Sequence, residues 1–148
     1  MSDLTLMKAF NFIDESNGDF DGEKPQSLIE KAEKTLGLYF PRSYKAFLQK
    51  YGCGDADGVE FYGVINDDFE NSSVPDAIWL TLEERKTGLP NHLVIISSSG
   101  DGSYYALDTS KMIGHECPVI LVGIDGDETV THENFASFVT SSLSFSEV

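Results

Sequence analysis

The 148-residue chain is poor in positive charge. It has ten Lys and Arg residues against 25 Asp and Glu residues, which gives a formal net charge of −15. Proteins that bind DNA or RNA neutralise phosphates with clustered cations, so the sequence argues against a nucleic-acid-binding protein. The same negative field repels anionic membrane surfaces and attracts a strongly basic protein partner. The alternative is that the acidity only keeps a small protein in solution.

The chain also lacks long apolar runs and is poor in cysteine. No run approaches the roughly 18 residues that a membrane-spanning helix needs. The first residues, MSDLTLMK, do not combine a basic start with a long apolar stretch, so we expect no secretory signal and a cytoplasmic protein. Cys53 and Cys117 have no CxxC spacing and no histidine at ligand spacing, which predicts two buried thiols and no zinc site.

Motifs that would carry catalysis or bind a cofactor are missing. Gly100-Asp101-Gly102 is not followed by the Lys-Ser/Thr and the helix of a phosphate-binding loop, so it predicts a hairpin turn. Asn17–Gly22 has oxygen ligands at calcium-loop spacing, but Leu28 stands where a bidentate Glu is needed. The histidines fall in three separate turn regions, at His92, His115 and His132. Because there is also no HExxH or GxSxG, we predict no catalytic residues, no cofactor and no metal site.

The pattern of apolar residues predicts a mixed fold. Helical spacing indicates helices over about residues 4–16, 25–36, 41–51, 75–87 and 133–144. Short apolar runs predict strands over about residues 59–65, 93–96, 104–108, 118–122 and 129–131. The first run reads either as a short strand pair or as one bent strand with a bulge at Gly63. Because regular βα alternation is absent, we predict a single α+β domain, with a mostly antiparallel sheet of about 4–6 strands packed with helices.

Acidic residues are concentrated where cations are missing. From Tyr51 to Glu84 the chain carries nine acids and no Lys or Arg, and after Lys111 there is again no cation. The segment from Lys24 to Lys50 carries most of the basic residues. We expect this segregation to leave one face strongly negative, and the alternative is a set of solvated loops. The aromatic residues near the acids would anchor a partner if exposed but more often belong to the core: Phe61, Tyr62, Phe69 and Trp79.

One segment resembles a known family signature. Residues 36–54, LGLYFPRSYKAFLQKYGCG, are similar to the SMI1/KNR4 (SUKH) signature, which reads roughly Leu-Gly, Leu-Pro, Tyr-Lys, Phe-Leu and Gly-Gly. Cys53 stands where many members have Gly. The turn Ser99–Gly102 with Tyr105 and Asp108, and the strand entry Cys117-Pro118-Val119, resemble further family features. The resemblance covers about residues 25–143.

The resemblance implies an α+β domain without known catalysis. In bacteria such domains are mostly immunity proteins that neutralise a toxin, often the nuclease domain of a polymorphic toxin, including LXG-type toxins. In fungi, relatives regulate cell-wall synthesis. We therefore predict a non-enzymatic immunity protein whose partner is a cognate toxin with a basic nuclease domain; the alternative is a regulatory or scaffold domain. Charge alone predicts the toxin-binding residues: Asp55, Asp57, Glu60, Asp67, Asp68 and Glu70.

Overall fold

The computed structural model describes residues 3–143. Its helices are α1 (Asp3–Glu15), α2 (Gln26–Leu36), α3 (Arg42–Tyr51), α4 (Ala77–Arg85) and α5 (Phe135–Leu143), with a short 3₁₀ helix η1 (Thr109–Lys111). Its strands are β1 (Asp19–Phe20), β2 (Gly54–Ala56), β3 (Val59–Phe61), β4 (Leu93–Ser98), β5 (Tyr104–Asp108), β6 (Val119–Val122) and β7 (Glu128–His132). No helix within residues 3–143 has the length and apolar character needed to cross a bilayer.

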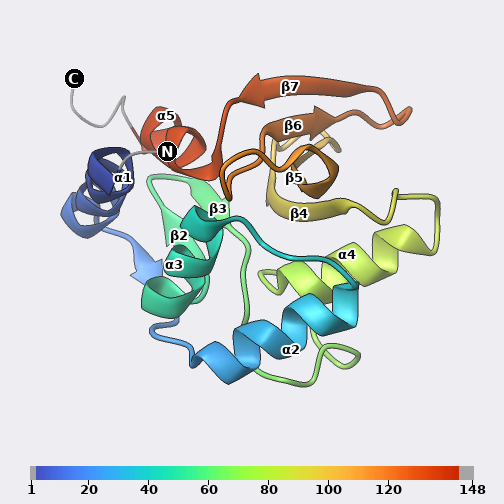
Figure 1. Ribbon diagram of the computed structural model, residues 1–148, viewed down its shortest axis with the longest axis horizontal. Helices are drawn as coiled ribbons and strands as arrows, with labels where there is room; N and C mark the ends of the chain where they lie inside the picture. Colours follow the sequence, from blue (N-terminus) through green and yellow to red (C-terminus); the bar gives the residue numbers. More distant parts are fainter. Residues whose placement is uncertain (1–2, 144–148) are drawn as a thin grey trace.

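The strands form two antiparallel sheets. One has three strands in the order β1-β2-β3, and the other has four in the order β4-β5-β6-β7. Figure 1 shows the three-stranded sheet and α1 at one end of the molecule and β4 to β7 at the other, with α4 alongside β4. A hydrogen bond from Tyr62 N to Ile96 O (2.8 Å) connects the two sheets. The predicted α+β class with antiparallel pairing is confirmed, although the strands divide between two sheets.

The first hairpin lies earlier in the chain than the sequence prediction placed it. The expected strand over residues 59–65 is the short strand β3, and its partner β2 occupies residues for which no strand was predicted. Asp57 (φ 52°) and Gly58 (φ 81°) make the two-residue turn between them, which is the Asp-Gly sequence favoured in tight hairpins. Gly63 lies beyond β3, where a Cβ atom would collide with the backbone of Gly52. Gly63 therefore allows close backbone packing and does not form a bulge.

The helices begin and end close to their predicted limits. Gly37 adopts a left-handed conformation (φ 72°) and ends α2, as the sequence indicates. Asp76 caps α4 by accepting hydrogen bonds from the backbone N–H groups of Ile78 and Trp79. The N-terminus of α3 is capped from far along the chain, because Ser43 N donates to the Glu116 carboxylate (2.9 Å). The last helix was expected to reach residue 144, which lies outside the described residues.

Aromatic residues from α3 and α5 fill the centre of the core. The Phe135 ring lies 5.0 Å from Tyr44 and 5.3 Å from Phe47, in edge-on contacts that aromatic pairs favour. The apolar run of β4 is buried on both sides. Val94 and Ile96 belong to this central core, whereas Leu93 and Ile95 belong to the smaller clusters on the other side of the sheet. Burial on both faces explains why β4 is a continuous apolar run.

Candidate interaction surface

Three carboxylates form a row across the three-stranded sheet. Asp19 of β1 is the register partner of Asp55 in β2, and Asp55 is the register partner of Glu60 in β3. Directly opposite residues of antiparallel strands point to the same face, with Cβ atoms about 5 Å apart. All three side chains are exposed, and Asp57 lies in the turn at the end of the same hairpin. We call Asp19, Asp55, Asp57 and Glu60 the acidic hairpin surface.

Residues 3–143 provide no ion-pair partner for the acids of this surface. Like charges directly opposite each other destabilise a sheet. An exposed row of unpaired acids therefore costs folding free energy and leaves its full negative potential available to a cationic partner.

The other three predicted residues lie in the loop from β3 to α4. This loop runs past α2 before it reaches α4 (Figure 1). Lys31 of α2 donates to the Asp67 carboxylate (3.3 Å), and the Asp68 carboxylate accepts from the backbone N–H of Asn71 (3.2 Å). Buried Phe69 fixes the loop to the core. Asp67, Asp68 and Glu70 are all exposed, but Asp67 already has a cation beside it.

The six predicted residues thus fall into two groups. Asp55, Asp57 and Glu60 come together on the hairpin, while Asp67, Asp68 and Glu70 come together in the loop. Sequence reasoning missed Asp19, because its place beside Asp55 depends on pairing between residues 36 positions apart. The aromatic residues near these acids do not serve as exposed anchors. Phe61, Tyr62 and Phe69 are buried and Trp79 is half-buried, as expected for core residues.

A cleft of about 930 Å³ is lined in part by basic side chains, one of which, Lys45, is paired with Glu33 (3.5 Å). It lies between the α2–α3 connection, α3, α1 and the segment after η1, and Arg42, Lys45 and His115 contribute to its lining. Leu38 and Met112 provide apolar walls. Tyr39, at its edge, is 77% exposed. The molecule therefore separates a basic, partly apolar cleft from the acidic hairpin surface.

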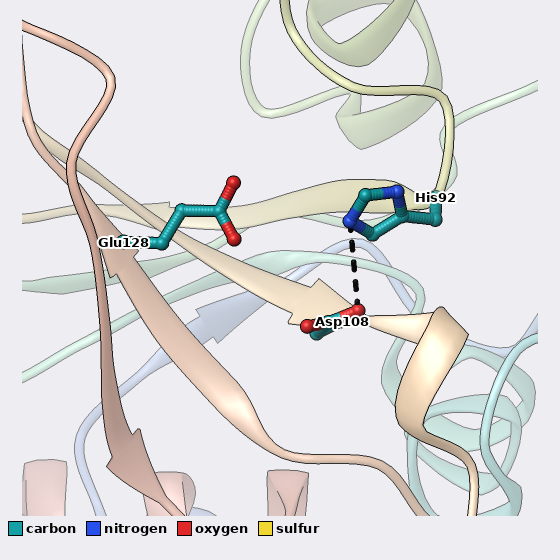
Figure 2. A group of neighbouring side chains, drawn as sticks. All are labelled: His92, Asp108 and Glu128. Atoms are coloured by element: carbon teal, nitrogen blue, oxygen red, sulfur yellow. Dashed lines mark ion pairs between the residues drawn. The ribbon is translucent and has the colours of Figure 1, made fainter.

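One group of side chains has donors of the kind that bind metal ions. His92, Asp108 and Glu128 each offer a ligand atom, and these atoms all lie within 4.8 Å of one another. Figure 2 shows the His92 ring facing Asp108, with the Glu128 carboxylate directed toward the pair. The sequence prediction treated His92 as a residue of an isolated turn. Its proximity to Asp108 depends on the register of β4 and β5, in which Leu93 pairs with Asp108.

The fold agrees with two comparisons with known proteins. A family model described as SMI1-KNR4 cell-wall (SUKH_5) matches residues 9–144. Among solved structures, the chain is similar to a crystal structure of a protein from Pseudomonas syringae pv. tomato. That comparison has a TM-score of 0.57 and 16% sequence identity, and it covers 93% of this chain and 92% of the other. Identity at this level shows a shared fold and nothing more.

Proposed function

We propose that this chain, which belongs to the SMI1/KNR4 family, is an immunity protein that inhibits a cognate toxin by covering its active cleft. The toxin would be a polymorphic or LXG-type toxin with a basic nuclease domain. Inhibition would be stoichiometric, with no chemical step performed by this chain. The family resemblance supports the class of function, and the charge distribution supports the kind of partner.

The observation that carries this proposal is the uncompensated row of acids on the three-stranded sheet. Asp19, Asp55 and Glu60 present three negative charges on adjacent strands. A nuclease grips phosphates with Lys and Arg, so its substrate cleft offers a matching positive surface. The acidic hairpin surface would occupy that cleft in place of nucleic acid.

A strongly negative inhibitor also has a kinetic advantage. A net charge of −15 attracts a basic partner over long distances and raises the association rate well above that of a neutral pair. Fast association matters for a protein that must capture a toxin before the toxin acts. Because exposed charges produce this attraction, salt should weaken the complex mainly by slowing association.

The test compares two charge-matched triple variants in cells that express a candidate toxin domain. The hairpin variant is Asp55→Asn, Asp57→Asn, Glu60→Gln, and the loop variant is Asp67→Asn, Asp68→Asn, Glu70→Gln. We expect the hairpin variant to bind the purified toxin domain at least 30-fold more weakly and to lose protection. The loop variant should change binding by less than about fivefold, because Asp67 is already paired with Lys31.

The two variants change net charge equally, so general electrostatics cannot explain a difference between them. Thermal unfolding would establish that both variants are folded. If the folded hairpin variant still protects cells as well as the unmodified chain, the acidic hairpin surface is not the toxin-binding surface.

A second candidate is a non-enzymatic regulatory or scaffold domain. The matching family model refers to the cell wall, and a domain of that kind would bind several partners. The basic cleft beside Tyr39 would then be a second contact surface. Affinity purification from the native host would separate the candidates, because an immunity protein should recover one toxin in a 1:1 complex.

A further inference from the structure

We propose that His92, Asp108 and Glu128 bind one divalent transition-metal ion, with Zn²⁺ as the representative ion. The three residues lie on the side of the four-stranded sheet away from the central core, and they come from three separate segments. His92 directly precedes β4, Asp108 ends β5, and Glu128 begins β7. The proposal is independent of toxin binding, because none of these residues belongs to the acidic hairpin surface.

The spacing of the ligand atoms is close to that of an occupied site. Zinc binds imidazole nitrogen and carboxylate oxygen at about 2.0–2.2 Å, which places neighbouring ligand atoms about 3–3.5 Å apart. His92 Nε2 lies 3.7 Å from Asp108 Oδ1, and all three ligand atoms lie within 4.8 Å. Glu128 is exposed, so its flexible side chain can close the remaining gap without moving the backbone.

Hydrogen bonds hold the side chain of Asp108 and the backbone of His92 in place. Asp108 is only 2% exposed, and its Oδ1 accepts hydrogen bonds from Ser110 N (3.2 Å) and Ser110 Oγ (2.6 Å). The backbone of His92 is fixed because Thr109 N (3.0 Å) and Thr109 Oγ1 (2.7 Å) both donate to its carbonyl oxygen. Hydrogen bonds to the ligating side chain, like those to the Asp108 carboxylate, orient metal ligands in known sites.

The local charge also favours a cation. Asp108 and Glu128 bring two carboxylates together. Lys111 Nζ lies 3.9 Å from Asp108 Oδ2, and Arg85 Nη2 donates to the carbonyl oxygen of Asn91, the residue before His92 (2.8 Å). The distance from Lys111 to Asp108 is too long for a hydrogen bond, and the Lys111 side chain is mostly exposed, so an incoming ion can displace it. A mixed set of one imidazole and two carboxylates suits Zn²⁺ and its neighbours, whereas Ca²⁺ and Mg²⁺ prefer oxygen ligands in larger number.

Metal binding would add a cross-link between the edge strand β7, which pairs only with β6 in the sheet, and the ends of β4 and β5. β7 lies at the end of the strand order, and four of its five residues are exposed. An ion held by Glu128 of β7 and by the His92–Asp108 pair would tie this strand to the ends of β4 and β5. The expected result is slower hydrogen exchange of the β7 amides when the ion is bound.

The experiment titrates ZnCl₂ into the chelator-treated full chain at pH 7.5, followed by calorimetry. We expect one saturable site per chain, and at about one hundred times Kd a rise of roughly 5–10 °C in the unfolding midpoint. His92→Asn and Glu128→Gln should each weaken Zn²⁺ binding at least tenfold. Two matched controls, His115→Asn and Glu133→Gln, remove an exposed histidine and an exposed acid elsewhere, and should change affinity less than twofold.

Three results would overturn the proposal. The first is the lack of saturable Zn²⁺ binding below about 1 mM. The second is equal loss of affinity in Glu128→Gln and Glu133→Gln, which would indicate diffuse binding to an acidic surface. The third is Zn²⁺ binding without any change in β7 amide exchange, measured at saturation in the unmodified chain.

Discussion

Replacing Asp55 by Asn should make the protein more stable. Asp55 lies between Asp19 and Glu60 in the sheet register, so it has a like charge on both sides. Each cross-strand repulsion of this kind costs about 0.2–1 kcal/mol, and solvent exposure places these pairs toward the lower half of that range. Removing both repulsions should therefore raise the free energy of unfolding by about 0.5–1 kcal/mol.

Urea unfolding of the unmodified chain and of Asp55→Asn would measure this difference. The gain should be largest at low ionic strength and should shrink by about half or more in 0.5 M NaCl, because salt screens exposed charges. Asp57→Asn is the matched control. It removes the same charge from the same hairpin at a left-handed turn position that Asn tolerates, and Asp57 has no register partner. Its effect on stability should stay within about 0.3 kcal/mol.

Two outcomes would refute this reasoning. A loss of stability in Asp55→Asn would mean that the carboxylate makes a favourable interaction that outweighs both repulsions. A gain that does not depend on salt would mean that charge is not its cause. Asp55→Asn should therefore make the protein more stable and weaken toxin binding. This trade-off is expected where a surface is retained for binding although it lowers the free energy of unfolding.

Two further predictions concern the protein interior. Glu116→Ala should lower the free energy of unfolding by about 2–4 kcal/mol in urea titrations, because fully buried Ser43 loses the acceptors of both its N–H and its hydroxyl. Glu116→Gln keeps one acceptor oxygen, so it should lower the free energy of unfolding by about half as much. Burial raises the pKa of the Cys53 thiol from its ordinary value of 9.0 to about 11 and that of Cys117 to about 12. Above pH 9 the folded chain therefore keeps both thiols protonated, whereas the unfolded chain releases the thiol protons. The free energy of unfolding should then fall as pH rises, by up to about 1.4 kcal/mol per pH unit for each thiol. The slope of unfolding free energy between pH 9 and 10 should be shallower in a Cys53→Ala, Cys117→Ala double variant, and an equal slope would contradict the stated cause.

Local signals in the sequence predicted most of the fold. The helices follow from apolar spacing together with proline and glycine at their ends, and the last strands follow from short apolar runs. β1 was not predicted, because two residues within an acidic segment carry no strand pattern of their own. The Asp57-Gly58 turn was present in the sequence as a hairpin signal, but β2 has too few apolar residues to suggest a strand before it.

The candidate sites depend on pairings that local signals do not contain. Composition identified an acid-rich stretch of the sequence, yet it could not show that Asp55 and Glu60 face the same side of a sheet or that Asp67 pairs with Lys31. The group of His92, Asp108 and Glu128 was out of reach for the same reason. Its members are brought together by three strands whose order and register are set by the whole core.

The acidic hairpin surface also depends on residues that carry no charge. A Cβ atom at Gly18 would lie 2.7 Å from the carbonyl oxygen of Asp55, and one at Gly54 would collide with the backbone of Asp19. A side chain at either position would therefore push β1 away from β2 and separate Asp19 from Asp55. Two glycines thus allow the close approach that lines up the acids, whereas Asp67, Asp68 and Glu70 have no register partners and Asp67 is paired with Lys31. This is the physical reason to prefer the hairpin over the loop of Asp67, Asp68 and Glu70 as the toxin-binding surface.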